Sequence, residues 1–203
     1  MKIICIGRNY ADHAREMKGE IPAKPVFFMK PETALVTGNR PFRHPGFSKD
    51  VHHEVEVVLR ISKRGKNIPE KEAPQYYNKI GLGIDFTARD LQRGMKEKGL
   101  PWEIAKAFDH SAPVSKFLPL KRFEDIHRLS FRLDVNGLTV QEGNTSDLIF
   151  SFENLIAYIS RFVTLQAGDL LFTGTPAGVG PVAKGDRLEA YLGRIKMLNF
   201  QVK

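Results

Sequence analysis

Apolar and polar positions alternate through residues 52–60, and a period of two residues is typical of a β-strand. Valine and leucine side chains occupy one side of this pattern, and Glu54 and Glu56 begin the other side. Residues two apart in a strand share a face and lie about 7 Å apart. The two carboxylates are therefore expected to point the same way.

Two interpretations of this Glu-x-Glu strand are open. Neighbouring carboxylates repel each other, and partial burial would raise their pKa values. A divalent cation between Glu54 and Glu56 would remove this repulsion, and hard oxygen ligands suit Mg²⁺, Mn²⁺ or Ca²⁺. Alternatively, the segment is a half-exposed edge strand with a solvated acidic face.

The rest of the pattern is also dominated by strands. Alternation and turn residues predict strands at residues 1–7, 26–30, 80–85, 129–135, 138–142, 170–173, 187–192 and 195–202. An Asn-Gly pair at 136–137 predicts a hairpin turn. Helical spacing predicts a helix from Ser151 to Phe162, and a capping box of Thr87 and Asp90 predicts a second helix from Thr87.

Strands outnumber helices, and the chain contains no repeat, low-complexity tract or linker. About two substantial helices are expected, with a short polar helix over residues 12–18. This pattern predicts one α+β domain over residues 1–203, built on packed and mostly antiparallel sheets.

The composition narrows the function classes. The 203 residues are 42% apolar and 27% charged, as in soluble globular proteins, and no apolar run approaches the ~18 residues of a membrane span. The net charge of +8 is scattered, which favours a small anionic substrate and leaves a basic nucleic-acid-binding module as a remote alternative. The single Cys5 and the short apolar segment at the start, which is too short for a signal peptide, predict a cytoplasmic protein. The lack of a basic block with interleaved aromatic residues and of a long apolar run predicts no nucleic-acid or membrane partner.

Several side chains carry candidate chemistry. His13 and Glu16 share a helix face, and a carboxylate beside an imidazole suits a general base; a surface ion pair is the alternative. Lys30 and Lys106 each stand in apolar company, as expected of a lysine that reaches solvent or holds an anion. Asp85 follows a predicted strand, where it is either a ligand or a plain turn residue.

Residues 174–181 form a loop rich in glycine and proline. Such a loop can offer backbone N–H groups and the Thr175 hydroxyl to an anion. It lacks the Lys-Ser/Thr ending and the following helix of a phosphate loop. A wide turn is the alternative interpretation.

Together these features supply three acids, a His-Glu pair, two lysines and a threonine loop. Three carboxylates with water molecules form an octahedral oxygen site for Mg²⁺ or Mn²⁺. Lysines beside such a site would bind a substrate carboxylate. The combination fits a 2-oxo acid, whose carboxylate and keto oxygens can chelate the cation.

The ordered motifs resemble the fumarylacetoacetate hydrolase family, in particular its short acylpyruvate hydrolase and oxaloacetate decarboxylase branch, over essentially the whole chain. The matching segments are Gly7-Arg8-Asn9-Tyr10 with His13 and Glu16, residues 28–31, Glu54-x-Glu56, Asp85, residues 87–92, Lys106-Ala-Phe-Asp and residues 173–181. The resemblance implies a mixed β-sandwich roll of the type of the family's C-terminal domain, with few helices, and a homodimer.

The resemblance also implies a role for each matching residue. The implied metal ligands, for Mg²⁺ or Mn²⁺ with Ca²⁺ as a substitute in crystals, are Glu54, Glu56 and Asp85. The implied catalytic residues are Lys106 and a lid dyad of His13 and Glu16. The implied substrate contacts are Arg8, Lys30, Gln92 and Thr175.

The sequence departs from the family pattern in two places. The founding hydrolases carry an additional acidic ligand upstream of the histidine, where this chain has Arg8 and Asn9, so three protein ligands are expected. Phe86 stands where a smaller aliphatic residue is expected, which would change the shape of the pocket near the metal.

These residues predict an enzyme that acts on small anionic 2-oxo acids. The leading hypothesis is hydrolysis of the carbon–carbon bond of acylpyruvates, decarboxylation of oxaloacetate, or both. An isomerase or decarboxylase of unsaturated dioates from aromatic degradation is the alternative enzyme. A metal-free structural homologue is a third interpretation.

Overall fold

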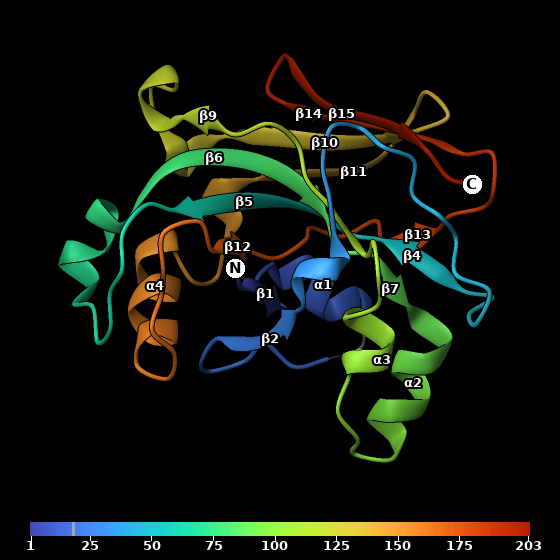
Figure 1. The fold of residues 1–203 in the computed structure, drawn as a ribbon, viewed down its shortest axis with the longest axis horizontal. Helices are drawn as coiled ribbons and strands as arrows, with labels where there is room; N and C mark the ends of the chain where they lie inside the picture. Colours follow the sequence, from blue (N-terminus) through green and yellow to red (C-terminus); the bar gives the residue numbers. More distant parts are fainter. Residues whose placement is uncertain (18) are drawn as a thin grey trace.

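The computed structural model describes residues 1–17 and 19–203. Its largest sheet crosses the middle of the molecule (Figure 1). The strands of this sheet are β1 (Ile3–Gly7), β2 (Val26–Lys30), β5 (Val55–Ile61), β6 (Tyr77–Ile84), β9 (Leu118–Pro119) and β12 (Leu170–Phe172). Their order is β2-β1-β12-β5-β6-β9, and only the β1–β12 pair among these neighbours of the described chain is parallel.

A second sheet is antiparallel throughout and lies above the first in the view of Figure 1. Its strands, in the order β11-β10-β14-β15, are β10 (Ser130–Val135), β11 (Leu138–Asn144), β14 (Arg187–Leu192) and β15 (Ile195–Gln201). Val57 and Leu82 of the first sheet share one buried cluster with Leu133 and Leu188 of the second. The two sheets therefore enclose the main core, as in a sandwich.

Shorter elements surround these sheets. The remaining strands are β3 (Leu35–Val36) paired with β8 (Ala112–Pro113), and β4 (Val51–His53), β7 (Thr87–Ala88) and β13 (Gly180–Pro181) in the order β13-β4-β7. The α-helices are α1 (Ala11–Glu16), α2 (Arg89–Glu97), α3 (Glu103–Lys106) and α4 (Phe152–Ser160). Short 3₁₀ segments occupy Glu32–Ala34, Glu70–Tyr76, Leu120–Arg122, Ile126–Arg128 and Thr145–Asp147.

This architecture confirms the predicted α+β class with mixed sheets and few helices. The expected helices correspond to α2 and α4, and the short one to α1; Lys18, at its predicted end, lies outside the described residues. The sequence pattern did not predict α3. Among the helices of residues 1–17 and 19–203, none combines the length and apolar content that crossing a membrane requires.

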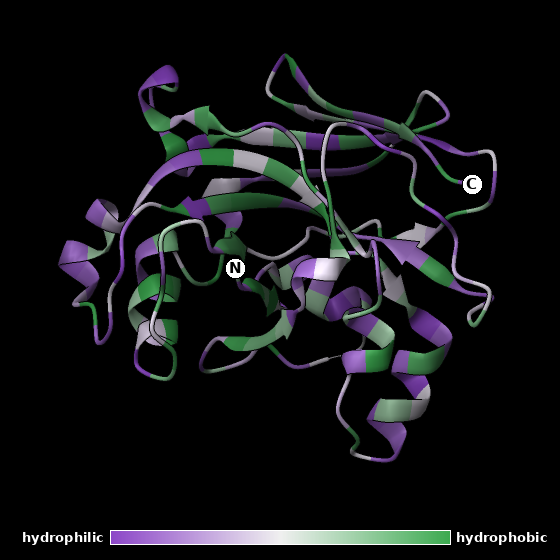
Figure 2. Cartoon of the chain, viewed as in Figure 1, coloured by the Kyte–Doolittle hydropathy of each residue, from purple (hydrophilic) through white to green (hydrophobic). Residues whose placement is uncertain are grey.

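The strand that carries the Glu-x-Glu motif lies inside the sheet, between β12 and β6. Glu54 and Glu56 are 5% and 1% exposed, and β5 is hydrophobic along most of its length in Figure 2. One face of β5 contacts the main core. The other face contacts a smaller buried cluster that includes Cys5, Val58 and Phe172. The edge-strand interpretation is therefore wrong, because both faces of the strand are covered.

The predicted capping box at Thr87 is also wrong, because α2 begins two residues later, at Arg89. Thr87 pairs with His52 in the β4–β7 ladder, and its hydroxyl donates to the carbonyl of Asp85 at 3.3 Å. Asp90 accepts from the Ser48 hydroxyl at 2.7 Å instead of closing the box. Thr87 thus lies in a strand with its hydroxyl bound locally, and Asp90 is bound to a residue distant in sequence.

Two local predictions are confirmed at the level of single residues. Asn136 and Gly137 have φ angles of 52° and 83°, which a type I′ hairpin turn requires at both central positions. Ser151 caps α4 by accepting a hydrogen bond from the N–H of Asn154 at 3.2 Å. The helix is shorter than predicted, however, and Phe162 lies beyond it with 55% of its surface exposed.

Gly83 lies on β6 opposite Glu56 of β5, where a side chain has no room. A Cβ at this position would lie 2.5 Å from a ring carbon of Phe172 and 2.9 Å from a methyl of Val58. We expect Gly83→Ala to lower the free energy of unfolding by about 1–3 kcal/mol, because both neighbours are fully buried and cannot move without strain. Urea unfolding followed by circular dichroism measures the change.

Gly94→Ala is the matched control for this prediction. Gly94 lies within α2, and a Cβ there would have no heavy atom within 4 Å. Alanine in an open helical position should stabilise the protein by up to about 1 kcal/mol. A Gly83→Ala variant as stable as the parent would contradict the packing described for β6.

Candidate metal centre and active site

Three buried acids lie close together at the start of β5 and the end of β6. Glu54 occupies the break between β4 and β5, Glu56 is on β5, and Asp85 follows the last residue of β6. The N–H of Asp85 donates to the carbonyl of Glu54 at 2.8 Å, which fixes the two ends side by side. One carboxylate oxygen from each residue lies within 4.8 Å of the others. The structure thus brings together the predicted trio.

The three acids differ in their electrostatic surroundings. Burial, followed by the charges of Asp85 and Glu54, raises the pKa of Glu56 well above its usual range, although Gly174 N–H donates to its Oε2 at 2.6 Å. Burial also acts on Glu54, but the adjacent cations Lys106 and Arg89 outweigh it and hold the pKa of Glu54 well below the usual range. Glu56 is therefore the member of the trio that lacks a cationic side chain in direct contact among the described residues.

Three cations contact the other two acids. Lys106 Nζ lies 2.7 Å from Glu54 Oε2 and 2.7 Å from Asp85 Oδ2, so it bridges them. Arg89 Nη2 lies 2.5 Å from Glu54 Oε1, and Lys30 Nζ lies 2.7 Å from Asp85 Oδ1. Loss of one member of such a buried network typically destabilises a protein by about 3–5 kcal/mol.

The trio fits a hard divalent cation. Lys30 is close to Asp85 Oδ1 but is not aligned to donate to it, so this oxygen is buried without a hydrogen-bond partner among the described residues. The charge of Lys30 offsets that of Asp85, whereas Glu56 has no cationic side chain in contact among the described residues, and a bound divalent cation would supply that missing positive charge. Carboxylate oxygens at this spacing are the ligands that Mg²⁺, Mn²⁺ and Ca²⁺ prefer.

A cavity of about 240 Å³ opens beside Glu54. Its walls include five other predicted site residues, Arg8, His13, Gln92, Lys106 and Thr175. The remaining lining residues are Ile6, Gly7, Met17, Val26, Phe28, Arg89, Lys96 and Trp102. The predicted substrate contacts and catalytic residues, apart from Lys30 and Glu16, therefore line the same cavity as Glu54, one of the three acids.

His13 reaches this cavity from α1 and is 6% exposed. Its Nδ1 lies 3.3 Å from Glu16 Oε2, as the helical spacing predicted. Burial lowers the pKa of His13, whereas Glu54 and Glu16 raise it. The net shift is downward from 6.5, so the imidazole is neutral at pH 7 and able to accept a proton.

The glycine-rich loop binds protein carboxylates. Gly174 N–H donates to Glu56, and Gly178 N–H donates to Glu16 Oε1 at 3.1 Å. The Thr175 hydroxyl donates to the carbonyl of Val55 at 2.8 Å. The sequence predicted that this loop offers donors to an anion; in the structure, the anions bound by these two N–H groups are side chains of the site itself.

Lys30 and Phe86 lie differently from what their sequence positions suggested. Lys30 is 2% exposed, and its amine donates to the hydroxyl of Ser111 at 2.9 Å and to neighbouring backbone carbonyls beneath Asp85. The Phe86 ring stacks on Phe42 in the main core, with centroids 3.7 Å apart. The expectation that Phe86 changes the pocket shape is wrong, because its side chain points away from the cavity.

Comparison with known proteins shows to which family the chain belongs. Residues 2–203 match the family described as fumarylacetoacetate (FAA) hydrolase C-terminal. The chain belongs to the fumarylacetoacetate hydrolase family. This family membership confirms the resemblance that the sequence motifs indicated, and the fold agrees with it.

Similar proteins in this family include named enzymes. The mouse (Mus musculus) protein called oxaloacetate tautomerase FAHD1, mitochondrial, is 46% identical over 201 residues, which cover 99% of this chain and 91% of the mouse protein. The oxaloacetate decarboxylase, mitochondrial, of Dictyostelium discoideum is 44% identical over 185 residues, which cover 91% and 85% of the two chains. The expectation of an enzyme is confirmed by these relatives.

A solved structure in the same family is also very similar. Fumarylpyruvate hydrolase from Pseudomonas aeruginosa, crystallised with Mn²⁺ and pyruvate, superposes with a TM-score of 0.94 at 38% sequence identity. The match covers 100% of this chain and 89% of the Pseudomonas chain. The β-sandwich roll expected for a fumarylacetoacetate hydrolase domain is thereby confirmed.

Two residues that line this cavity, Arg89 and Lys96, were not predicted individually. With the predicted Gln92 they stand at i, i+3 and i+7 on α2, so the three share one helix face. α2 is largely hydrophilic in Figure 2, and the residues that it buries, Arg89 and Gln92, are polar. A helix whose buried face is polar signals a functional surface, and this pattern could have been read from the sequence.

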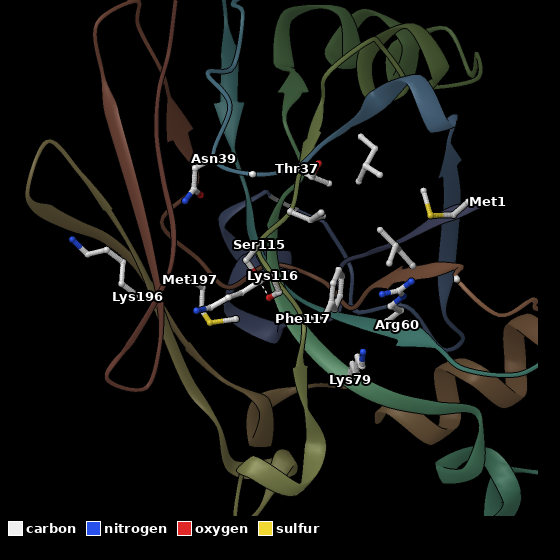
Figure 3. Close-up of a pocket in the computed structure, with 15 residues that line it drawn as sticks. Met1, Thr37, Asn39, Arg60, Lys79, Ser115, Lys116, Phe117, Lys196 and Met197 are labelled. Atoms are coloured by element: carbon white, nitrogen blue, oxygen red, sulfur yellow. Dashed lines mark hydrogen bonds between the residues drawn. The ribbon is translucent and has the colours of Figure 1, made fainter.

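A second cavity, of about 610 Å³, lies at the far end of β5 (Figure 3). Arg60 and Lys79, which are direct neighbours across β5 and β6, line it together with Lys116 and Phe117. Among the described residues that line this second cavity, none is a predicted site residue of the family. The candidate active site is therefore the smaller cavity beside the acids.

Proposed function

We propose that this fumarylacetoacetate hydrolase family member is a divalent-cation-dependent enzyme acting on small 2-oxo acids. It cleaves the carbon–carbon bond of acylpyruvates, decarboxylates oxaloacetate, or does both. The observation that carries this proposal is the buried trio of Glu54, Glu56 and Asp85 at the side of a small cavity rich in cations. The names of the mouse, Dictyostelium and Pseudomonas proteins support the same substrate class.

Glu54, Glu56 and Asp85 hold Mg²⁺ or Mn²⁺ in this proposal. The donor set consists only of carboxylate oxygens, and the similar Pseudomonas hydrolase was crystallised with Mn²⁺. When bound, the cation acts as a Lewis acid toward the carboxylate and keto oxygens of a 2-oxo acid.

His13 is the general base for acylpyruvate hydrolysis. Its neutral imidazole takes a proton from water, Glu16 stabilises the resulting imidazolium, and the hydroxide adds to the distal acyl carbonyl. The carbon–carbon bond then breaks, which releases a carboxylic acid and the enolate of pyruvate. Lys106 stabilises the negative charge that develops on that enolate, and the enolate takes up a proton to give pyruvate.

The other predicted residues bind the substrate. Gln92 and Thr175 line the cavity near Glu54 and orient the 2-oxo end. Arg8 contributes positive charge at the cavity wall. Lys30 does not line the cavity and contacts Asp85 instead. Its direct contact with the substrate stays a prediction.

A proton-transfer isomerase is the second candidate function. The mouse relative is named a tautomerase, and tautomerisation needs only removal and return of a proton, which His13 and Lys106 can supply. The related alternative is an isomerase or decarboxylase of unsaturated dioates. Neither reaction requires water activation, and this difference separates them from hydrolysis.

A small substrate panel tests these assignments. Protein stripped with a chelator is assayed on acetylpyruvate, fumarylpyruvate, oxaloacetate and an unsaturated dioate, before and after addition of Mg²⁺ or Mn²⁺. We expect activity on an acylpyruvate or on oxaloacetate that depends on the cation. Activity confined to isomerisation of the dioate would favour the second candidate, and activity that survives chelation would contradict the cation requirement.

The remaining expectations concern assembly and location. Residues 1–203 act as one catalytic domain, which assembles as a homodimer in the cytoplasm. Phe47 and Ile104, which are 54% and 55% exposed, form part of an apolar surface that supports self-association. Size-exclusion chromatography with light scattering tests the dimer, and a monomeric mass at micromolar concentration would contradict it.

A further inference from the structure

Two like charges lie directly opposite each other in the middle of the largest sheet. Arg60 of β5 pairs with Lys79 of β6, and their other ladder neighbours are Leu170 of β12 and Pro119 of β9. Like charges directly opposite each other destabilise a strand pair. Neither cation forms an ion pair within the part of the chain that the structure describes. An anion in contact with both side chains would remove this repulsion.

Both cations line the second cavity, of about 610 Å³ (Figure 3). Arg60 lies on the same face of β5 as Glu56, because residues an even number of positions apart in a strand share a face. The two are four residues, or about 13 Å, apart along the strand. The second cavity shares no lining residue with the cavity beside the acids. It is therefore a separate space at the other end of the same sheet face.

The segment between β8 and β9 adds a third cation and an aromatic ring. Gly81 of β6 lets this segment lie against the sheet, because a Cβ there would be 3.0 Å from the Ser115 hydroxyl and 3.2 Å from a ring carbon of Phe117. Ser115 N–H donates to the carbonyl of Leu82 at 2.9 Å, and Leu82 N–H donates to the Ser115 hydroxyl at 3.0 Å. These contacts fix the chain where Lys116 and Phe117 line the second cavity.

The lining of the second cavity is basic without any compensating acid. Among its described residues, none is an aspartate or a glutamate. Of its four basic side chains, Lys196 is paired with Glu189, at 2.6 Å, and Glu189 lies outside the lining. Arg60, Lys79 and Lys116 thus present three unpaired positive charges to one space. Leucine, valine and methionine side chains complete the walls, so the cavity combines a basic part with an apolar part.

We propose that the second cavity binds a nucleoside polyphosphate. The phosphates contact Arg60 and Lys79 through charge-assisted hydrogen bonds, the base packs against Phe117, and Lys116 adds positive charge to the same cavity. A volume of about 610 Å³ suits a ligand of this size. A lone phosphate ion would contact the cations but leave the aromatic and apolar walls uncovered, which favours a nucleotide. This binding is independent of any reaction at the acid trio.

Isothermal titration calorimetry tests the site on Mg²⁺-loaded protein, with Mg²⁺ in excess over nucleotide so that the nucleotide does not withdraw a bound cation. ATP should bind at least about tenfold tighter than AMP, because additional phosphate oxygens contact the cations. It should also bind at least about threefold tighter than tripolyphosphate, because the base stacks on Phe117. Arg60→Met and Lys79→Met should each weaken ATP about tenfold, and Arg60→Lys should weaken it less.

Lys71→Met is the control, because Lys71 is an exposed residue of the 3₁₀ segment Glu70–Tyr76 and lines neither cavity. It removes the same charge and should leave the affinity for ATP within about twofold. Thermal unfolding without nucleotide verifies the fold, and Lys79→Met should unfold at or above the temperature of the parent, because cross-strand repulsion is removed. Absence of ATP binding to the parent, equal weakening by Lys71→Met and Lys79→Met, or tripolyphosphate that binds as tightly as ATP would overturn the nucleotide site.

Discussion

Replacing Glu56 by glutamine is expected to remove the divalent cation and to lower kcat/KM by at least about a thousandfold, without destabilising the metal-free protein. A Lewis acid contributes several kcal/mol of transition-state stabilisation, and each 1.36 kcal/mol is a factor of ten. Glu56 faces Asp85 and Glu54 with no cation in contact among the described residues, so glutamine removes repulsion. The amide oxygen can still accept the hydrogen bond from Gly174.

The combination of the two readouts makes this substitution informative. Elemental analysis after gel filtration measures bound Mg²⁺ or Mn²⁺, and thermal unfolding in a chelator measures stability. The control is Glu142→Gln, which removes an exposed acid of β11 and should change neither quantity. A Glu56→Gln protein that retains a stoichiometric cation and full activity would contradict the proposed ligand set.

Replacing His13 by alanine is expected to leave cation binding intact and to lower acylpyruvate hydrolysis by about a hundredfold to ten-thousandfold, the usual contribution of a general base. Oxaloacetate decarboxylation should fall less, because loss of CO₂ needs no activated water. Initial rates on acetylpyruvate and oxaloacetate, together with metal content, test this split. An equal loss for both substrates, or loss of the cation, would contradict a specific role in water activation.

The pH profile provides a second test of the same residue. The neutral form of His13 is the active one, so kcat/KM of the parent should fall as the pH drops through the pKa of His13. Because burial lowers this pKa, the midpoint of the acid limb should lie below pH 6.5. Glu16→Gln removes a contact that raises the pKa and should move the midpoint to still lower pH, whereas Asp12→Asn on the exposed side of α1 should not. A midpoint above 6.5 would contradict the assignment.

The Glu54 and Glu56 pair was predictable from a local rule, because a two-residue period places both side chains on one face. The addition of Asp85 as the third ligand came from the resemblance to the family, because its proximity depends on the pairing of β5 with β6. The burial of these acids was less accessible to sequence reasoning. Alternation with valine is equally compatible with an edge strand, and only the position of β5 between β12 and β6 distinguishes the two.

Other errors have a common physical cause, which is competition from partners distant in sequence. Thr87 could cap a helix, but it pairs with His52 across β4 and β7. The loop N–H groups could bind a ligand, but Glu56 and Glu16 reach them from elements more than a hundred residues away. Long-range contacts of this kind leave no periodic signal in the sequence around either partner.

The central position of β5 has a consequence for how the enzyme tolerates heat. Glu56 is part of a strand whose two faces contact two buried clusters, so the cation ligands cannot separate unless most of the sheet opens. Activity and the folded structure should therefore be lost in the same cooperative thermal transition. Warming should not produce folded protein that has lost only the arrangement of its metal ligands.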